Sequence, residues 1–391
     1  MNQSRRLVLG LGAATLARTF INTSRRFAYP FAPVLSRGLG VPLTAVTSLI
    51  AVNQATGLLS PVFGPLGDRW GYRAPMLVGL GMLGVGMLTG GLLPVYSAVL
   101  LALFLAGLGK NVFDPALQAY VGERVPYRRR GLAIGAIEMA WAGSSLVGIP
   151  LAGLLIDRLG WRSPFFVLGG LGLCGMVALR VLIPGDGGQE HTADRLTGLG
   201  EAWRRLSRER AALGALGFGF LVAAANDNLF VVYGAWLETT FGLSIVALGA
   251  ATTVIGAAEL LGEGLTASIA DRLGLKRAVM AGLGLSGLSY ALLPLTGSSL
   301  PLALAGLFAI FLSFEFTIVT AYSLFTEILP GERATMMSSS LAASGVGRMV
   351  GALMGGAVWL AGGLAATGLV SAALSGLALA WLVWGLRGWR A

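Results

Sequence analysis

The sequence predicts an all-α integral membrane protein in which two six-helix bundles follow one another along the chain. Of its 391 residues, 55% are hydrophobic and only 12% are charged, and the mean hydropathy is +0.77. A soluble domain has about a quarter of its residues charged. The 59 glycines are twice the usual share of about 7%, and small residues let helices approach closely in lipid.

Twelve stretches are long and apolar enough to cross a bilayer, which takes about 20 residues of helix. Arg5 and Arg6 before the first stretch would also suit a signal peptide, but the eleven later spans favour a first span that is kept. The expected spans are residues 7–33, 43–65, 74–93, 97–121, 131–157, 164–183, 212–236, 244–268, 278–295, 300–325, 335–360 and 363–386.

The basic residues predict the sidedness of these spans. Of the 28 lysines and arginines, 19 fall in the loops of one side, whereas the opposite loops hold only Arg37, Arg158 and Arg162. Because positive loops stay in the cytoplasm, we expect a multi-pass protein of a bacterial-type inner (plasma) membrane with both termini cytoplasmic. The net charge of +10 is then a topology signal, and no nucleic-acid partner is expected.

One long polar stretch predicts the domain boundaries. We expect an N-terminal six-helix bundle at 1–183, a cytoplasmic linker at 184–211 and a C-terminal six-helix bundle at 212–391. Within the linker, Leu199, Trp203 and Leu206 share one helix face with arginines opposite. This pattern indicates a short helix on the inner leaflet, with a solvated linker as an equal alternative.

The two bundles repeat at an offset of 203 residues. Asp68-Arg69 then matches Asp271-Arg272, and the Gly-Leu-Gly motif at 79–81 matches the one at 282–284. Two six-span halves of the same orientation, related by a pseudo-two-fold axis, are typical of transporters in which the halves rock about a site near the midplane.

The loop between the second and third spans carries a family resemblance. Its sequence, Gly64-Pro-Leu-Gly-Asp68-Arg69-Trp-Gly71-Tyr-Arg73, resembles the signature loop of the major facilitator superfamily, and a weaker copy at 267–277 starts with Ala267 in place of glycine. The resemblance implies that both loops form a cytoplasmic gate that latches the halves; the alternative is a charge group that only sets topology. The implied gate residues are Gly64, Asp68, Arg69, Gly71, Arg73, Asp271, Arg272 and Gly274.

The fifth span resembles a motif of antiporters in this superfamily. It contains Gly143, Gly148, Pro150 and Gly153, but the proline follows Gly148 by two positions instead of one. This departure weakens the inference of antiport. Small residues with a proline still favour a closely packed helix that can bend.

Charged side chains inside the spans are the candidates for function, because they are costly in hydrocarbon. On the first span Arg18, Asn22, Arg25 and Tyr29 form one stripe at helical spacing. The resemblance implies that spans 1, 4, 7 and 10 line the path of a substrate. Structural ion pairing, such as Lys110 with Asp114 at i, i+4, is the alternative. The predicted substrate-binding residues are Arg18, Asn22, Arg25, Tyr29, Asn111, Asp114, Asn226, Asp227, Asn228 and Glu315.

Carboxylates inside the spans are candidates for carrying protons. Glu259 and Glu263 lie one turn apart, and two neighbouring carboxylates in a low dielectric resist ionising together. Structural pairing of Glu263 or Glu315 with Arg348 accounts for them equally well. The predicted proton-coupling residues are Glu138, Asp227, Glu259, Glu263 and Glu315.

Other chemistry is excluded by composition. The chain has one cysteine, Cys174, and one histidine, His191, so we expect no metal site and no cofactor. Gly107-Leu-Gly109-Lys110 does not complete a phosphate loop, so energy would come from a gradient. We therefore expect no enzyme activity.

The leading prediction is a monomeric secondary transporter that exports a small organic solute by alternating access, coupled to protons and embedded in the lipid bilayer. The first alternative is uptake of an anionic metabolite, proton-coupled or facilitated, in which arginines of span 1 hold a carboxylate or phosphate. The second alternative is a membrane sensor that kept the fold and lost transport.

Overall fold

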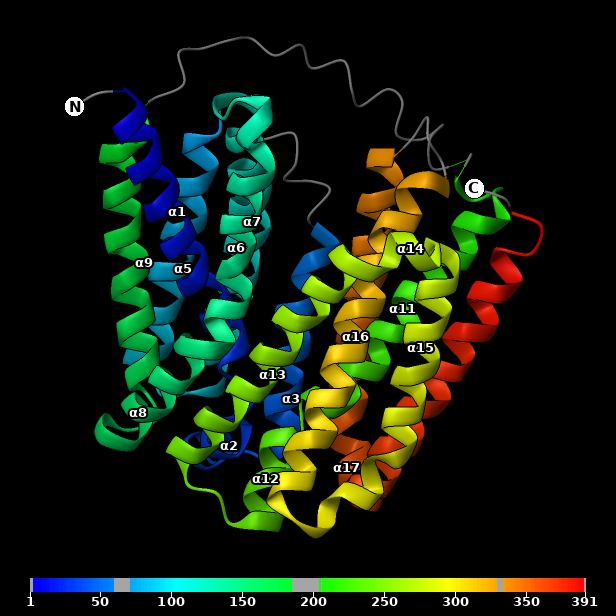
Figure 1. Cartoon of the computed structure of the whole chain (residues 1–391). Helices are drawn as coiled ribbons and strands as arrows, with labels where there is room; N and C mark the ends of the chain where they lie inside the picture. The colour runs from blue at the N-terminus through cyan, green and yellow to red at the C-terminus, as the bar shows by residue number, and fades with distance from the viewer. Residues whose placement is uncertain (1–2, 60–70, 185–203, 205, 329–332, 390–391) are drawn as a thin grey trace. The chain divides into compact units, whose positions relative to one another are not determined.

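The computed structural model describes residues 3–59, 71–184, 204, 206–328 and 333–389. Within these ranges every regular element is a helix (Figure 1). The chain divides into two units, Met1–Ala193 with Ile245–Ala250 and Asp194–Ser244 with Ala251–Ala391. Most of the predicted linker, with Leu199 and Trp203, lies outside the described residues.

In the first unit, α1 packs on α6, α7 and α9, and α5 packs on α6 and α9. Phe27 and Phe165 meet edge to face in its core, with ring centroids 5.2 Å apart. Its helices are α1 (Gln3–Arg26), α2 (Ala32–Leu39), α3 (Leu43–Ala55) with the turn η1 (Thr56–Leu59), α5 (Arg73–Leu92), α6 (Tyr96–Arg124), α7 (Tyr127–Gly143), the π-helical turn η2 (Ser144–Gly148), α8 (Ile149–Leu159) and α9 (Ser163–Leu182).

In the second unit, α11 packs along α17, and α15 packs on α16 and α17. Phe218 and Phe325 belong to its apolar core, with ring centroids 5.8 Å apart. Its helices are α11 (Arg210–Phe230), α12 (Tyr233–Phe241), the part of α13 (Ile245–Leu265) that follows Ala250, the π-helical turn η3 (Thr266–Ala270), α14 (Asp271–Leu273), α15 (Leu275–Leu292), the 3-10 turn η4 (Leu293–Ser298), α16 (Leu300–Ile328) and α17 (Arg333–Gly385).

The helices agree with a multi-pass membrane protein. Nine helical segments of the described chain are long and apolar enough to cross a bilayer, and α2 with α3, bent by 114°, would make a tenth. The last of the nine holds two predicted spans, because α17 is interrupted at Gly362 and Gly363. α1 has sufficient length, with 24 residues, but its polar stripe makes it less apolar than these segments.

The prediction of one continuous helix at 7–33 is wrong. α1 ends at Arg26, and residues 27–31 form a turn before α2. Pro30 explains the break, because proline lacks an N–H group and its ring clashes with the carbonyl four residues earlier. The predicted helix at 212–236 is likewise broken at 231–232, between α11 and α12, where two β-branched valines disfavour helix.

The backbone repeats between the two units at the predicted offset. Gly40 and Gly242, which follow α2 and α12 and lie one residue off this offset, have φ of 65° and 64°. Gly71 and Gly274, at the ends of the two signature loops, have φ of 73° and 80°. Such left-handed conformations favour glycine, so the sequence repeat reflects a repeat of backbone turns.

The repeated Gly-Leu-Gly motif marks a close helix contact in each unit. A Cβ atom at Gly79 would lie 2.6 Å from a carbonyl oxygen of α6, and one at Gly282 would lie 2.5 Å from Oγ1 of Thr317 on α16. The second glycines of the motif have room: Gly81 would meet only a methionine sulfur at 3.6 Å, and Gly284 would meet nothing within 4 Å.

We therefore expect Gly79→Ala to lower the melting temperature of the purified protein in detergent, because overpacking costs about 1–3 kcal/mol. Gly81→Ala is the matched control, and it should leave stability unchanged or raise it, since alanine is the better helix former. The same contrast is expected between Gly282→Ala and Gly284→Ala. Equal melting temperatures within either pair would contradict the contact.

Candidate functional site

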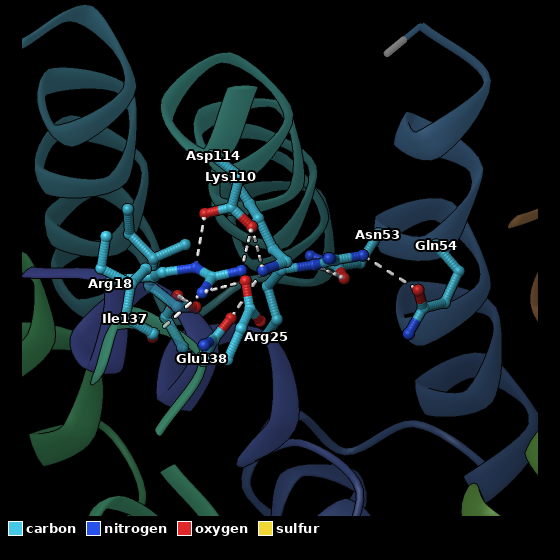
Figure 2. Close-up of polar contacts among 11 residues, drawn as sticks. Arg18, Arg25, Asn53, Gln54, Lys110, Asp114, Ile137 and Glu138 are labelled. Carbon is cyan, nitrogen blue, oxygen red and sulfur yellow. Dashed lines mark hydrogen bonds and ion pairs between the residues drawn. The ribbon is translucent and has the colours of Figure 1, made fainter. Parts of the chain in front are cut away.

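Arg18 of α1 is the centre of a buried ionic cluster in the first unit (Figure 2). Its side chain is only 6% exposed, and it forms ion pairs with Asp114 of α6 at 3.1 Å and Glu138 of α7 at 2.9 Å. A further N–H group donates to the carbonyl oxygen of Ile137 at 3.0 Å. One guanidinium thus connects three helices, and the fork geometry suits the two oxygens of Asp114.

Lys110 completes the cluster from α6. Its Nζ lies 2.5 Å from Oδ2 of Asp114, one turn away, and 2.8 Å from Oδ1 of Asn22 on α1. Asn22 is fully buried, and its amide nitrogen has no hydrogen-bond partner among the described residues. The cluster therefore satisfies Asp114 twice but leaves one buried donor beside two cations.

Arg25 and Tyr29 belong to a neighbouring polar group. Arg25 donates to the side-chain oxygens of Asn53 at 3.0 Å and Gln54 at 2.9 Å, and Gln54 donates to the Tyr29 hydroxyl at 2.5 Å. Arg25 before the helix break and Tyr29 after it are thus connected through Gln54 of α3. Sequence reasoning missed Asn53 and Gln54, although an adjacent pair of amides inside an apolar span was the signal.

The remaining predicted residue of this unit lies elsewhere. Asn111 of α6 donates to Oγ1 of Thr56 at 3.1 Å, at the contact of α6 with η1. Arg26, another cation of the first predicted span, lies over the ring of Trp141 at 4.3 Å.

In the second unit, Asp227 of α11 is fully buried and pairs with Arg348 of α17 at 3.1 Å. Two glycines of α17 allow the helices to come close enough for this ion pair, because a side chain at Gly347 or Gly351 would collide with the backbone of α11. The partners predicted for Arg348 from the sequence are Glu263 and Glu315, and the pair with Asp227 is one that the sequence did not predict. Arg348 also lies 5.9 Å from the ring of Phe314 on α16.

The three consecutive polar residues of α11 point to different neighbours. Asn226 accepts a hydrogen bond from the Tyr290 hydroxyl of α15 at 3.3 Å, whereas Asn228 donates to Oγ of Ser371 on α17 at 3.0 Å. Successive helix residues lie about 100° apart, so they cannot all face one path. Asn226, Asp227 and Asn228 are brought to one level of the membrane but not to one surface.

The other predicted proton carriers of this unit lie on α13 and α16. Glu259 is 3% and Glu315 is 9% exposed, and Glu263 is half-buried one turn from Glu259. A side chain at Gly262 would begin 2.9 Å from Cβ of Glu315, so Glu315 packs against the turn of α13 next to Glu263. Glu138, the other predicted proton carrier, is instead held by Arg18 in the first unit.

The predicted gate is only partly described. Gly64, Asp68 and Arg69 lie outside the described residues, as does the side chain of Asp271. Arg73 donates to the carbonyl of Arg180, near the end of α9, and Lys276, at the equivalent position of the repeat, donates to the carbonyl of Leu386 after α17 at 2.8 Å. Arg272 is exposed. These cations complement the C-terminal ends of helices in their own units, and the latch stays a prediction.

Charge inside the predicted spans is divided unequally between the units. The first has three acids, Asp114, Glu138 and Asp157, against five cations, Arg18, Arg25, Arg26, Lys110 and Arg180. The second has a single cation, Arg348, against four acids. Inside the spans, the charges of the whole chain therefore nearly cancel, although one half has an excess of two positive charges and the other an excess of three negative charges.

The sequence matches the family model of the Major Facilitator Superfamily twice, over residues 14–231 and 216–389. The chain belongs to the major facilitator superfamily. It is therefore a multi-pass membrane transporter and not an enzyme, as the sequence predicted. Its bacterial relatives imply a cell membrane as its location.

Relatives and solved structures of this superfamily align along most of the chain. An uncharacterized MFS-type transporter of Bacillus subtilis, YceJ, is 28% identical and covers 86% of this chain and 85% of its own. A multi-drug resistance efflux pump PmrA homolog of Lactococcus lactis is 24% identical and covers 87% and 85%. The inward-facing, occupied crystal structure of a bacterial homolog to the human lysosomal transporter Spinster superposes with a TM-score of 0.77, at 17% identity and 99% and 98% coverage.

We expect Asp114→Asn to destabilise the protein strongly, because it leaves Arg18 and Lys110 facing each other without their shared acid. Removing one partner of a buried ion pair costs about 3–5 kcal/mol. Thermal unfolding in detergent measures the loss, and Lys110→Met in the same background should restore part of it. Glu123→Gln, at the exposed end of α6, is the control; a similar melting temperature for both single variants would show that the cluster contributes little.

Proposed function

We propose that this transporter exports a small organic solute by alternating access and uses the inward movement of protons as its energy source. The observation that carries the proposal is the excess of buried acids in the second unit. A carboxylate that takes up a proton loses the cost of being charged in hydrocarbon, so surplus acids are suited to bind and release protons. The similarity to an efflux pump homolog supports export.

Two carboxylates of this set fit the role of proton carrier best. Glu259 lies on α13 and Glu315 on the adjacent helix α16, and both side chains are buried. Glu263 follows Gly262, the residue of α13 against which Glu315 packs. Three carboxylates so placed repel one another when ionised. Asp227 is paired with Arg348, which stabilises its charged form. We propose that the protein acts as a monomer with both termini in the cytoplasm, as the arginine distribution predicts.

We expect Glu315→Gln to uncouple transport from the proton gradient. The assay loads proteoliposomes with the pH dye pyranine and follows proton movement as ethidium, fluorescein or a neutral dye is added. The variant should lower proton movement by at least about tenfold, the size of effect typical of a positioned proton-transfer group. Glu327→Gln, at an exposed position of α16, is the matched control. Proton movement that is equal in wild type and Glu315→Gln would refute this role.

A second candidate function is transport of an organic anion. The first unit favours it, with two excess positive charges in its spans and the unpartnered amide of Asn22 beside Lys110. A carboxylate or phosphate could accept hydrogen bonds from both groups. In this version the solute and protons would enter together.

We expect Asn22→Ala to weaken binding of an anionic substrate roughly tenfold or more, since a hydrogen bond to a charged group contributes about 1.5–3 kcal/mol. Inhibition of transport by unlabelled organic anions provides the measurement. Asn111→Ala removes the same side chain from a helix contact of the same unit and is the control. Fluorescein uptake driven by an inward proton gradient would favour this candidate, and ethidium movement against that gradient would favour export.

A further inference from the structure

A groove runs along the exposed face of α1 at its N-terminal end. Its volume is about 1320 Å³, and it is walled by α1, the end of α6, the start of α7 and the end of α9. Figure 1 shows α1 with α7 and α9 as its neighbours. On α1, Val8 and Leu16 are 66% and 60% exposed. The groove residues Leu7 and Leu11 lie on the Arg18 face of α1, about three and two turns before Arg18, whereas Leu16 lies about 160° away from Arg18 around the helix. The groove therefore lies along α1 on the N-terminal side of the ionic cluster.

The walls of the groove are apolar, and its basic residues gather at one end. Leu11, Ala13, Ala133 and Ile137 are among the wall residues, whereas Arg6 and Arg124 line the end at the helix termini. The groove extends along α1 from Arg6 to Leu16, a rise of roughly 15 Å. This is about half of a hydrocarbon core of about 30 Å, which is the depth of one leaflet.

We propose that this groove binds an anionic phospholipid, with one acyl chain along α1 and the phosphate at Arg6 and Arg124. Guanidinium groups bind phosphate through paired hydrogen bonds, and basic pockets between membrane helices bind acidic headgroups. One N–H of Arg6 donates to the carbonyl of Val181 and orients the side chain at the groove end. Glu123 lies 3.5 Å from Arg124 but offsets only one of the two cations.

The groove is joined to the ionic cluster by one residue. Ile137 lines its wall, and the carbonyl oxygen of Ile137 accepts a hydrogen bond from Arg18. A lipid chain packed on this part of α7 would hold Ile137 and Glu138 against Arg18. The lipid site is therefore a structural support of the cluster and does not depend on which solute is transported.

The experiment measures lipid binding to the full chain in detergent by native mass spectrometry. Phosphatidylglycerol and phosphatidylcholine with the same acyl chains are titrated separately. We expect the first lipid bound to be phosphatidylglycerol, with an affinity roughly tenfold or more above that of phosphatidylcholine. Arg6→Ala with Arg124→Ala should remove this preference. Arg277→Ala with Arg387→Ala removes as much charge from exposed positions of the other unit and should keep it.

A second variant tests the apolar part of the groove. A side chain at Gly12 would meet nothing within 4 Å, so Gly12→Leu fills the groove without a clash. It should weaken binding of both lipids at this site, whereas Gly284→Leu, an equally open glycine of α15, should not. Melting temperatures confirm that both variants are folded. Equal affinity for the two lipids, a preference that survives the double arginine variant, or unchanged binding by Gly12→Leu would each overturn the proposal.

Discussion

An ionised side chain inside hydrocarbon needs compensation close by, and this constraint shapes the interior of both units. Asp114 is held by Arg18 from α1 and by Lys110 from its own helix, and Arg18 reaches on to Glu138 of α7. Removing any one of these four charges would leave one charge of the cluster without compensation in a low dielectric. The ion pairs therefore fix how α1, α6 and α7 pack, in addition to any role that they have in binding a solute.

The duplication of the chain preserved packing and changed the chemistry. The paired left-handed glycines, the Gly-Leu-Gly contacts and the basic residues Arg73 and Lys276 repeat in both halves. The residues of the ionic cluster do not repeat, since the position equivalent to Arg18 is Leu221 and the one equivalent to Asp114 is Thr317. Backbone turns and close helix contacts are constraints that both halves share. The charged residues are not bound by these constraints, and the two halves differ in them.

The sequence could predict the spans, the repeat and the family, because hydrophobic length, glycine spacing and the signature loop are local patterns. It could also predict that Arg18, Asn22 and Arg25 share a face, since helical spacing determines this. It could not predict the break at 27–31, because apolarity continues past Pro30 although the hydrogen bonding does not. Nor could it decide that Asp227 is the acid beside Arg348, because that pairing depends on how α11 and α17 pack through glycines far apart in the chain.

The unequal division of charge links the direction of transport to the charge of the solute. An inside-negative membrane potential opposes the entry of an anion and favours its exit by about 2.3 kcal/mol per charge per 100 mV. An importer of anions therefore needs protons that travel with the solute, whereas an exporter of anions gains from the potential directly. An exporter of neutral or cationic solutes needs protons that travel the opposite way. The acids of the second unit serve either kind of coupling, so the excess cations of the first unit decide between them. If these cations only hold α1, α6 and α7 together, export of a neutral or cationic solute follows. If they bind the solute, the solute is an anion, and the surplus acids then favour proton-coupled uptake, because an exporter of anions has no need of protons.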